Sequence, residues 1–209
     1  MGRVLVACEF SGVVRRAFRA AGHDAWSCDL LPAEDGSEFH VQDSVFHRGL
    51  LTLGWDLLIA HPPCTFMANS GAKHLYLGMK KENGPNPERW RSMEAAADFF
   101  LALWEAPIPR IAVENPIMLG HAQQRIGARP SQIIHPWQHG HGESKATCLW
   151  LKNLPLLTPS NVVDGRDQRI WRMPPSADRQ KERSRTFDGI ASAMAAQWGP
   201  LLDAERIAA

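Results

Sequence analysis

The sequence lacks the features that would direct it into a membrane, out of the cell or around a disulfide framework. No apolar run approaches the ~20 residues that cross a bilayer. The N-terminus, MGRVLVACEF, has no basic region, long apolar stretch or cleavage site typical of a signal peptide. The four cysteines lie far apart without a CxxC pair, which argues against a disulfide scaffold. We therefore expect a cytoplasmic protein.

An excess of one charge is also missing. The chain of 209 residues has 23 Lys and Arg against 22 Asp and Glu, a formal net charge of +1. This balance excludes a globally basic coat for nucleic acid but leaves room for a local basic patch. The length suits one domain, covering residues 1–209, with enough chain to bury a sizeable core.

Short apolar runs alternate with segments whose apolar spacing is helical. Strands are predicted at 3–8, 24–30, 55–60, 110–115, 131–137 and 146–151, and helices at 13–22, 87–104 and 188–202. We expect Ser11 to cap the first helix, residues 65–86 to form a loop and 164–185 an exposed linker. This order predicts an α/β fold with a mostly parallel sheet and helices on both faces. Ligands in such folds bind beyond the carboxyl ends of the strands.

The first two predicted strands end in residues that suit a nucleoside. Phe10, Ser11 and Gly12 follow the first strand, and Asp29 ends the second, where a carboxylate can accept hydrogen bonds from ribose hydroxyls. The full glycine-rich dinucleotide fingerprint is absent, which disfavours NAD and FAD. S-adenosylmethionine, a nucleoside without phosphates, fits better. The alternative is that Gly12 only makes a turn and Asp29 is only a surface acid.

Cys64 is the most informative residue of the chain. It follows a buried strand directly, and Pro62 and Pro63 stiffen its approach to the ligand edge. Free cysteines are usually small buried hydrophobes, which is our interpretation of the other three, expected inside strands: Cys8, Cys28 and Cys148. The position of Cys64 distinguishes it from these three, because it lies at the ligand edge and Glu114 and Asn115 end the next predicted strand.

These elements resemble the cytosine C5 methyltransferase family. The matching elements are FSG at 10–12, Asp29, Asp43 within VQDSV, PPC at 62–64, VENP at 113–116 and the final helical segment TFDGIASAMAAQWG. Their order covers most of the chain, and its small size is most similar to phage-encoded members. The resemblance implies a Rossmann-like, S-adenosylmethionine-dependent methyltransferase fold and transfer of a methyl group to cytosine C5 in DNA.

The resemblance also implies roles for individual residues. Cys64 is the expected nucleophile that adds to cytosine C6, and Glu114 the partner of N3, with Asn115 and Pro63 completing the catalytic set. The target base must be flipped out of the duplex. The residues expected to hold S-adenosylmethionine are Phe10, Ser11, Gly12, Asp29, Leu30, Asp43 and Pro62. An amino-methyltransferase is the rival, but its Asn/Asp-Pro-Pro-Tyr/Phe element is replaced here by His61 to Cys64.

The chain departs from the family in its C-terminal half. It lacks the arginine pair that follows the glutamate strand, and residues 153–186 leave room only for a short basic insertion instead of a recognition domain. From 166 to 185, six arginines and one lysine face three acids. A solvated surface run is the usual explanation, but a contact with DNA phosphates is our hypothesis. The expected contacts to double-stranded DNA are Lys145, Arg183 and Arg185.

Two further functions stay open at this point. The missing recognition domain allows an enzyme that methylates RNA or a free pyrimidine nucleotide. A non-catalytic nucleic-acid-binding module with the same fold is the other alternative. A metal site is not predicted, because the spacing of His135, His139, His141 and Cys148 matches no common ligand pattern.

Overall fold

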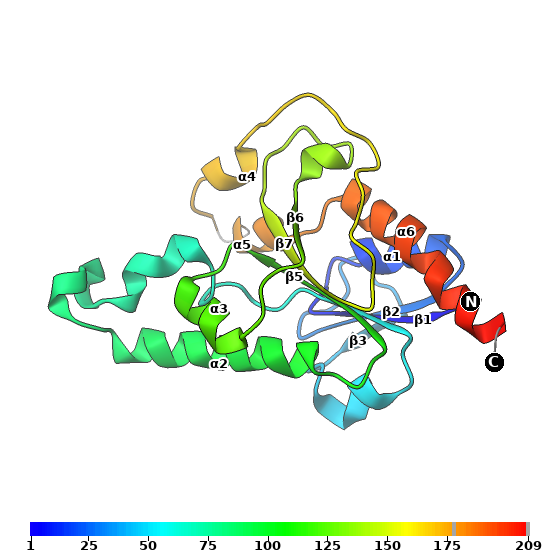
Figure 1. The fold of residues 1–209 in the computed structure, drawn as a ribbon, viewed down its shortest axis with the longest axis horizontal. Helices are drawn as coiled ribbons and strands as arrows, with labels where there is room; N and C mark the ends of the chain where they lie inside the picture. The colour runs from blue at the N-terminus through cyan, green and yellow to red at the C-terminus, as the bar shows by residue number, and fades with distance from the viewer. Residues whose placement is uncertain (177–178, 208–209) are drawn as a thin grey trace.

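A seven-stranded sheet organises the computed structural model, which describes residues 1–176 and 179–207 (Figure 1). The strand order is β3-β2-β1-β4-β5-β7-β6. The first five strands of the chain pair in parallel, and β7 runs antiparallel to both β5 and β6. The strands are β1 (Arg3–Ala7), β2 (Asp24–Asp29), β3 (His40–Gln42), β4 (Leu57–Ala60), β5 (Arg110–Pro116), β6 (Gln132–Ile134) and β7 (Thr147–Lys152). The predicted mostly parallel sheet is confirmed.

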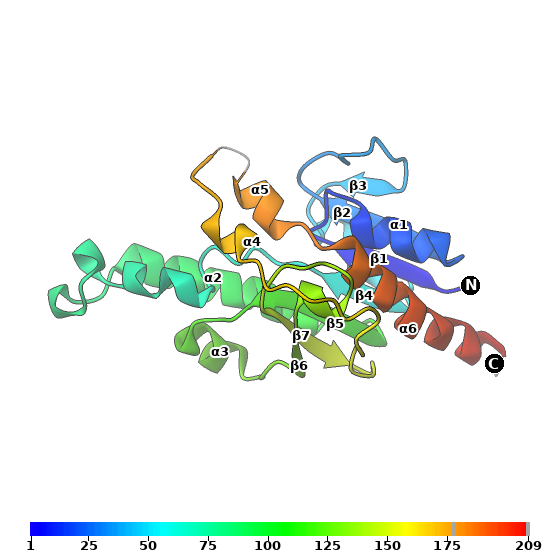
Figure 2. The ribbon, with the colours of Figure 1, turned by 90° about the horizontal axis from the view of Figure 1, so that it is seen from above.

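Helices cover both faces of this sheet, as predicted (Figures 1 and 2). One face carries α2 and α3 and the other carries α1 and α6. Short 3-10 turns make up much of the segment after β4, which extends away from the sheet on the left of Figure 1. The helices are α1 (Val13–Ala20), α2 (Pro87–Trp104), α3 (Gly120–Ile126), α4 (Arg169–Arg172), α5 (Arg179–Ser184) and α6 (Asp188–Ile207).

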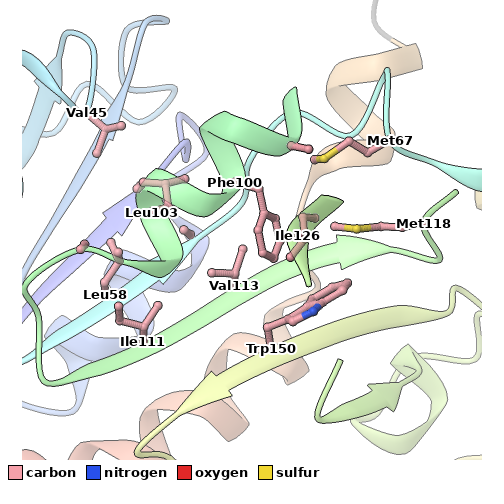
Figure 3. Close-up of a cluster of buried hydrophobic side chains, with 14 of the residues drawn as sticks. Val45, Leu58, Met67, Phe100, Leu103, Ile111, Val113, Met118, Ile126 and Trp150 are labelled. Atoms are coloured by element: carbon pink, nitrogen blue, oxygen red, sulfur yellow. The ribbon is translucent and has the colours of Figure 1, made fainter. Parts of the chain in front are cut away.

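The alternation of side chains along the strands divides the core into two layers. Leu58 and Val113 point to the side of α2, where Phe100 meets Trp150 edge to face with ring centroids 5.1 Å apart (Figure 3). Leu57 and other residues of the opposite face pack against α1 and α6. Because both faces are covered, the central strands are fully buried, which accounts for their continuous apolar sequences.

Helix ends correct one prediction and support another. Ser11 does not cap α1, whose N-cap is Gly12 at φ 67°. The carboxylate of Glu9 instead accepts hydrogen bonds from the amides of Val14 (2.7 Å) and Arg15 (3.2 Å). A carboxylate serves there because the first helical amides lack partners within the helix. The helix over 87–104 is confirmed, and the Asn86 side chain accepts from the amide of Arg89.

Four short elements differ from the predictions. The strand β3 and the helix α3 were not predicted, and the supposed linker 164–185 contains α4 and α5, which lie together in Figure 2. Cys8 lies one residue beyond β1, at φ 59°, and not inside the strand as expected. Elements of three to seven residues have too few apolar positions for a period to show.

The close approach of α6 to the 139–141 loop gives a test of this packing. A Cβ added at Gly189 would overlap the carbonyl oxygen of His139, whereas one added at Gly120 meets no described atom within 4 Å. We expect Gly189→Ala to lower the free energy of unfolding by about 1–3 kcal/mol, the usual cost of overpacking. Gly120→Ala is the matched control and should be neutral or slightly stabilising. Urea unfolding of both variants measures the difference, and equal stabilities would contradict the packing of α6.

Candidate active site

The carboxyl ends of β1, β4 and β5 meet at one edge of the sheet. The register pairs Ala7 with Ala60 and Ala60 with Val113, so the residues that follow these positions are neighbours across the strands. The connection after β1 leads to α1 on one face of the sheet and the connection after β4 leads to α2 on the other, which opens a crevice typical of ligand sites in open α/β sheets. A cavity of about 1500 Å³ lies at this edge.

Ten of the predicted site residues line this cavity, and four do not. Those in the lining are Phe10, Ser11, Pro62, Pro63, Cys64, Glu114, Asn115, Lys145, Arg183 and Arg185. The remaining four, all assigned to the cofactor, are Gly12, Asp29, Leu30 and Asp43. The structure therefore gathers the predicted catalytic and cationic residues, while most of the predicted cofactor set lies beside the cavity.

The four outlying residues have local contacts of their own. Asp29 accepts a hydrogen bond from the amide of Leu31 (2.9 Å) at the end of β2, and the Leu30 side chain is exposed. The Asp43 carboxylate contacts the imidazole of His47, which lowers the pKa of Asp43. Gly12 makes the turn into α1. Their positions follow the expected strand ends, and their role toward a cofactor stays a prediction.

Cys64 lies half-buried on the loop that follows β4. Its carbonyl oxygen accepts hydrogen bonds from the amides of Met67 (3.0 Å) and Ala68 (2.9 Å), which fixes the backbone beyond the two prolines. Burial raises the pKa of the Cys64 thiol, and the positive charges of Lys145 and Arg183 oppose that rise. Two cations therefore stabilise the thiolate that a nucleophile requires.

Glu114 is bonded to a histidine that the sequence had not marked as functional. His61 Nδ1 donates to Glu114 Oε2 over 3.0 Å, and both side chains are only 11% exposed. Thr186 Oγ1 donates to the same oxygen over 3.4 Å. Burial disfavours both charges, but each partner stabilises the other, so the pKa of His61 is raised and the pKa of Glu114 is lowered.

Two further side chains hold the floor of the cavity. Asn115 donates through Nδ2 to the carbonyl oxygen of Pro62 (3.0 Å), which joins β5 to the loop that carries Cys64. Glu9 lines the cavity and accepts hydrogen bonds from the first amides of α1, and burial raises its pKa against the opposing charge of His61. The sequence did not mark Glu9 or Thr186, because their roles depend on neighbours that are distant in sequence.

The cationic residues differ in how far their charge is already compensated. Arg185 makes an ion pair with Glu34 (Nη2 to Oε1, 2.9 Å) and lies 3.5 Å from Glu182. Its hydrogen bond holds the pKa of Glu34 at about 2. Lys145 donates to the carbonyl oxygen of Arg185 (3.4 Å) and its charge acts on Glu114 and Cys64. Lys145 and Arg183 therefore provide the positive charge nearest to the nucleophile.

The sequence predicts neither a metal site nor a membrane-spanning helix. Within residues 1–176 and 179–207, no group of three or more His, Cys, Asp and Glu side chains is arranged to hold a metal ion. His139 bonds to Ser160 (3.0 Å), and His141 accepts from the amide of Gly189 (3.0 Å). Among the described helices, none combines the length and apolar character needed to span a bilayer.

Comparison with solved structures supports the fold. A chain assigned as a DNA modification methyltransferase, encoded within an E. coli prophage, matches with a TM-score of 0.50 at 12% identity, over 84% of this chain and 56% of that chain. The sheet and its helices therefore form a Rossmann-like fold that this structure shares, as the resemblance implied. No protein-family model and no curated protein sequence matches the chain.

Two other solved structures match less well. An S. pombe Dnmt2 methyltransferase gives a TM-score of 0.37 at 14% identity, over 82% of this chain and 53% of that chain. A mutant of Spodoptera frugiperda DNMT2 gives 0.35 at 13% identity, over 85% and 61%. No conclusion rests on these two. The chain spans little more than half the length of the structures that it matches.

The charge around Cys64 gives a test of the site that needs no substrate. Lys145→Gln removes one of the cations that oppose the rise in the pKa of Cys64. We expect alkylation of Cys64 by iodoacetamide at pH 8 to slow by about 3- to 10-fold, because the thiolate is the reacting form. Lys80→Gln, which removes an exposed lysine of the 65–86 segment, is the control. Peptide mass spectrometry reads the rate at Cys64 alone; equal rates in both variants would contradict the assignment.

Proposed function

We propose that the protein transfers a methyl group from S-adenosylmethionine to C5 of cytosine in DNA. The observation that carries this proposal is the juxtaposition of Cys64 and Glu114 in one cavity, beneath the charge of Lys145 and Arg183. Cytosine C5 is a weak nucleophile, and addition of a thiolate to C6 is the usual way to activate it. A thiol whose ionisation two cations favour against the effect of burial, beside a carboxyl group, supplies the two groups that this addition needs.

The chain's own residues account for the order of events. Cys64 adds to C6 of the flipped base, and Glu114 bonds N3 so that the ring can accept the electron pair. Asn115 fixes the loop of Cys64 through the carbonyl oxygen of Pro62 and so keeps the thiol in place. After methyl transfer to C5, loss of the C5 proton expels Cys64 as thiolate. The position of each residue in the cavity supports the role that we propose for it.

The residues around the first βα turn fit an adenosine group without phosphates. Phe10 and Ser11 line the cavity, and Gly12 adopts a left-handed φ that keeps the turn tight. The arginines that follow do not offer a phosphate site, because Arg15 and Arg16 both pair with Asp35. Asp29, at the end of β2, would accept from the ribose hydroxyls. S-adenosylmethionine would supply a methyl group on a sulfonium sulfur, ready for attack by a carbon nucleophile.

Nucleoside mass spectrometry tests the function and its alternatives together. The protein is incubated with S-adenosylmethionine and, in separate reactions, duplex DNA, RNA and dCMP. We expect 5-methylcytosine in the DNA reaction, none with Cys64→Ala, and wild-type yield with Cys28→Ala, whose thiol lies outside the cavity. DNA containing 5-fluorocytosine should trap the wild-type protein covalently, because fluorine cannot leave as a proton. Product in the RNA or dCMP reaction alone would replace the DNA assignment, and binding without product would favour the non-catalytic module.

The salt dependence of DNA binding tests the cationic residues separately. Each phosphate contact contributes about 0.9 to the slope of log affinity against log salt on duplex DNA. We expect Arg183→Gln to lower the slope by nearly this amount, and Arg185→Gln by much less, because Glu34 already neutralises Arg185. Arg125→Gln, which breaks an exposed pair with Asp98 outside the cavity lining, is the control. Fluorescence anisotropy over a salt series gives the slopes; an equal effect of Arg183 and Arg185 would contradict the distinction.

A further inference from the structure

The pair formed by His61 and Glu114 is built by the sheet itself. The amide of His61 donates to the carbonyl oxygen of Ala7 (2.9 Å), which continues the pairing of β4 with β1 by one residue. On its other side β4 pairs with β5 in the register Ala60 with Val113, so His61 and Glu114 stand side by side. The bond from Nδ1 to Oε2 therefore needs no rearrangement of either backbone.

The other nitrogen of the ring has no partner of its own. His61 Nε2 is buried and makes no hydrogen bond to any described residue, although His61 lines the cavity. Nδ1 is bonded to a carboxylate, so a proton on this nitrogen is shared with Glu114. The pair is thus a proton-holding unit whose carboxylate also belongs to the candidate active site.

The surrounding charges set the resting state of the pair. Among the described residues, His61 and Glu114 interact electrostatically with four more titratable groups: Glu9, Lys145, Cys64 and Cys148. Burial disfavours the imidazolium, but Glu114 and Glu9 outweigh burial and raise the pKa of His61. For Glu114, His61 and Lys145 outweigh burial and lower its pKa. Both shifts favour an imidazolium beside a carboxylate.

This resting state conflicts with a simple role for Glu114 in the proposed reaction. An ionised carboxylate only accepts hydrogen bonds and cannot by itself give a proton to N3 of cytosine. We propose that His61 holds the reaction proton and passes it through Glu114 to N3 as Cys64 adds to the ring. This role rests on the proposed function, since it assumes that the base lies in this cavity.

The proton and electron movements balance. The Cys64 sulfur forms a bond to C6, the π pair of the C5–C6 bond moves through the ring to N3, and N3 takes a proton from Glu114. Glu114 takes a proton from Nδ1 of His61, which becomes a neutral imidazole. After C5 has taken the methyl group from the sulfonium, a water molecule in the cavity removes the C5 proton. The Cys64–C6 bond then breaks with its electron pair returning to sulfur, and the N3 proton returns through Glu114 to His61. The pair ends as it began.

His61→Asn separates proton transfer from positioning. The amide nitrogen of asparagine can occupy the place of Nδ1 and donate to Glu114, but it cannot release its proton. Glu114 must then carry the proton alone. The ordinary pKa of a carboxyl group is near 4.5, whereas that of an imidazole is near 6.5. The wild-type proton is available below the raised pKa of His61 and is lost as the pH rises through it. The basic limb of the kcat–pH profile should therefore move to lower pH in the variant.

The experiment is methyl transfer to duplex DNA by the full chain from pH 5 to 9. We expect His61→Asn to lower kcat at pH 8 by about 100-fold or more, with little change in KM for DNA and with the displaced basic limb. His121→Asn, an exposed histidine on α3, is the control and should leave the profile unchanged. A rate lowered by one factor at every pH, or a wild-type profile in His61→Asn, would overturn the relay while leaving methyl transfer intact.

A second measurement tests the pair without any substrate. NMR titration of the His61 imidazole should give a pKa above 6.5 in the wild type and a lower value in Glu114→Gln, which keeps the shape of the side chain but not its charge. A wild-type value at or below 6.5 would overturn the relay even if methyl transfer occurs. If the protein methylates none of the cytosine substrates, the proposed function is wrong. The relay is then wrong too, even if the titration shows that His61 and Glu114 interact.

Discussion

The parallel register of β1, β4 and β5 is the constraint on which the rest of the site depends. Ladder hydrogen bonds fix this register, and a slip of one residue would turn every side chain to the opposite face of the sheet. With the register observed, His61 and Glu114 follow paired positions on β4 and β5, and Glu9 lies two residues beyond the paired position on β1. The sheet rather than the loops therefore sets the geometry of the proton-holding pair.

The sequence was sufficient for the elements that bury much apolar surface. Strand β4 is fully buried and strand β5 almost fully buried. A continuous run of apolar residues in the sequence predicts such strands. The helix from Pro87 has a capping residue and a proline at its start. By contrast, β3 has no fully buried residue, and α4 has four residues, two of which are arginines. Such elements are stabilised by neighbours distant in sequence, which a local pattern does not contain.

The same reasoning separates the predicted from the missed site residues. Cys64 and Glu114 were marked because each stands at the end of a strong strand, where position alone is informative. His61 and Glu9 stand at equivalent positions but were passed over, since a histidine or glutamate has no distinctive role until its partner is known. The function of His61 depends on Glu114 across the sheet, and that of Glu9 on the free amides of α1. Interactions across the sheet were the missing information.

The short C-terminal segment has a consequence for how a small chain of this fold can act on a large substrate. Glu34, in the loop after β2, holds Arg185, and Lys181 pairs with the same carboxylate (3.2 Å). These two ion pairs hold α5 at the cavity, where the charge of Arg183 opposes the rise in the pKa of Cys64. Charges used in this way stabilise the thiolate and are screened less by salt than an exposed patch would be. They are correspondingly less available for reading a long stretch of DNA. In the proposed enzyme, the basic segment therefore serves the chemistry first, and its contacts with DNA phosphates would be few.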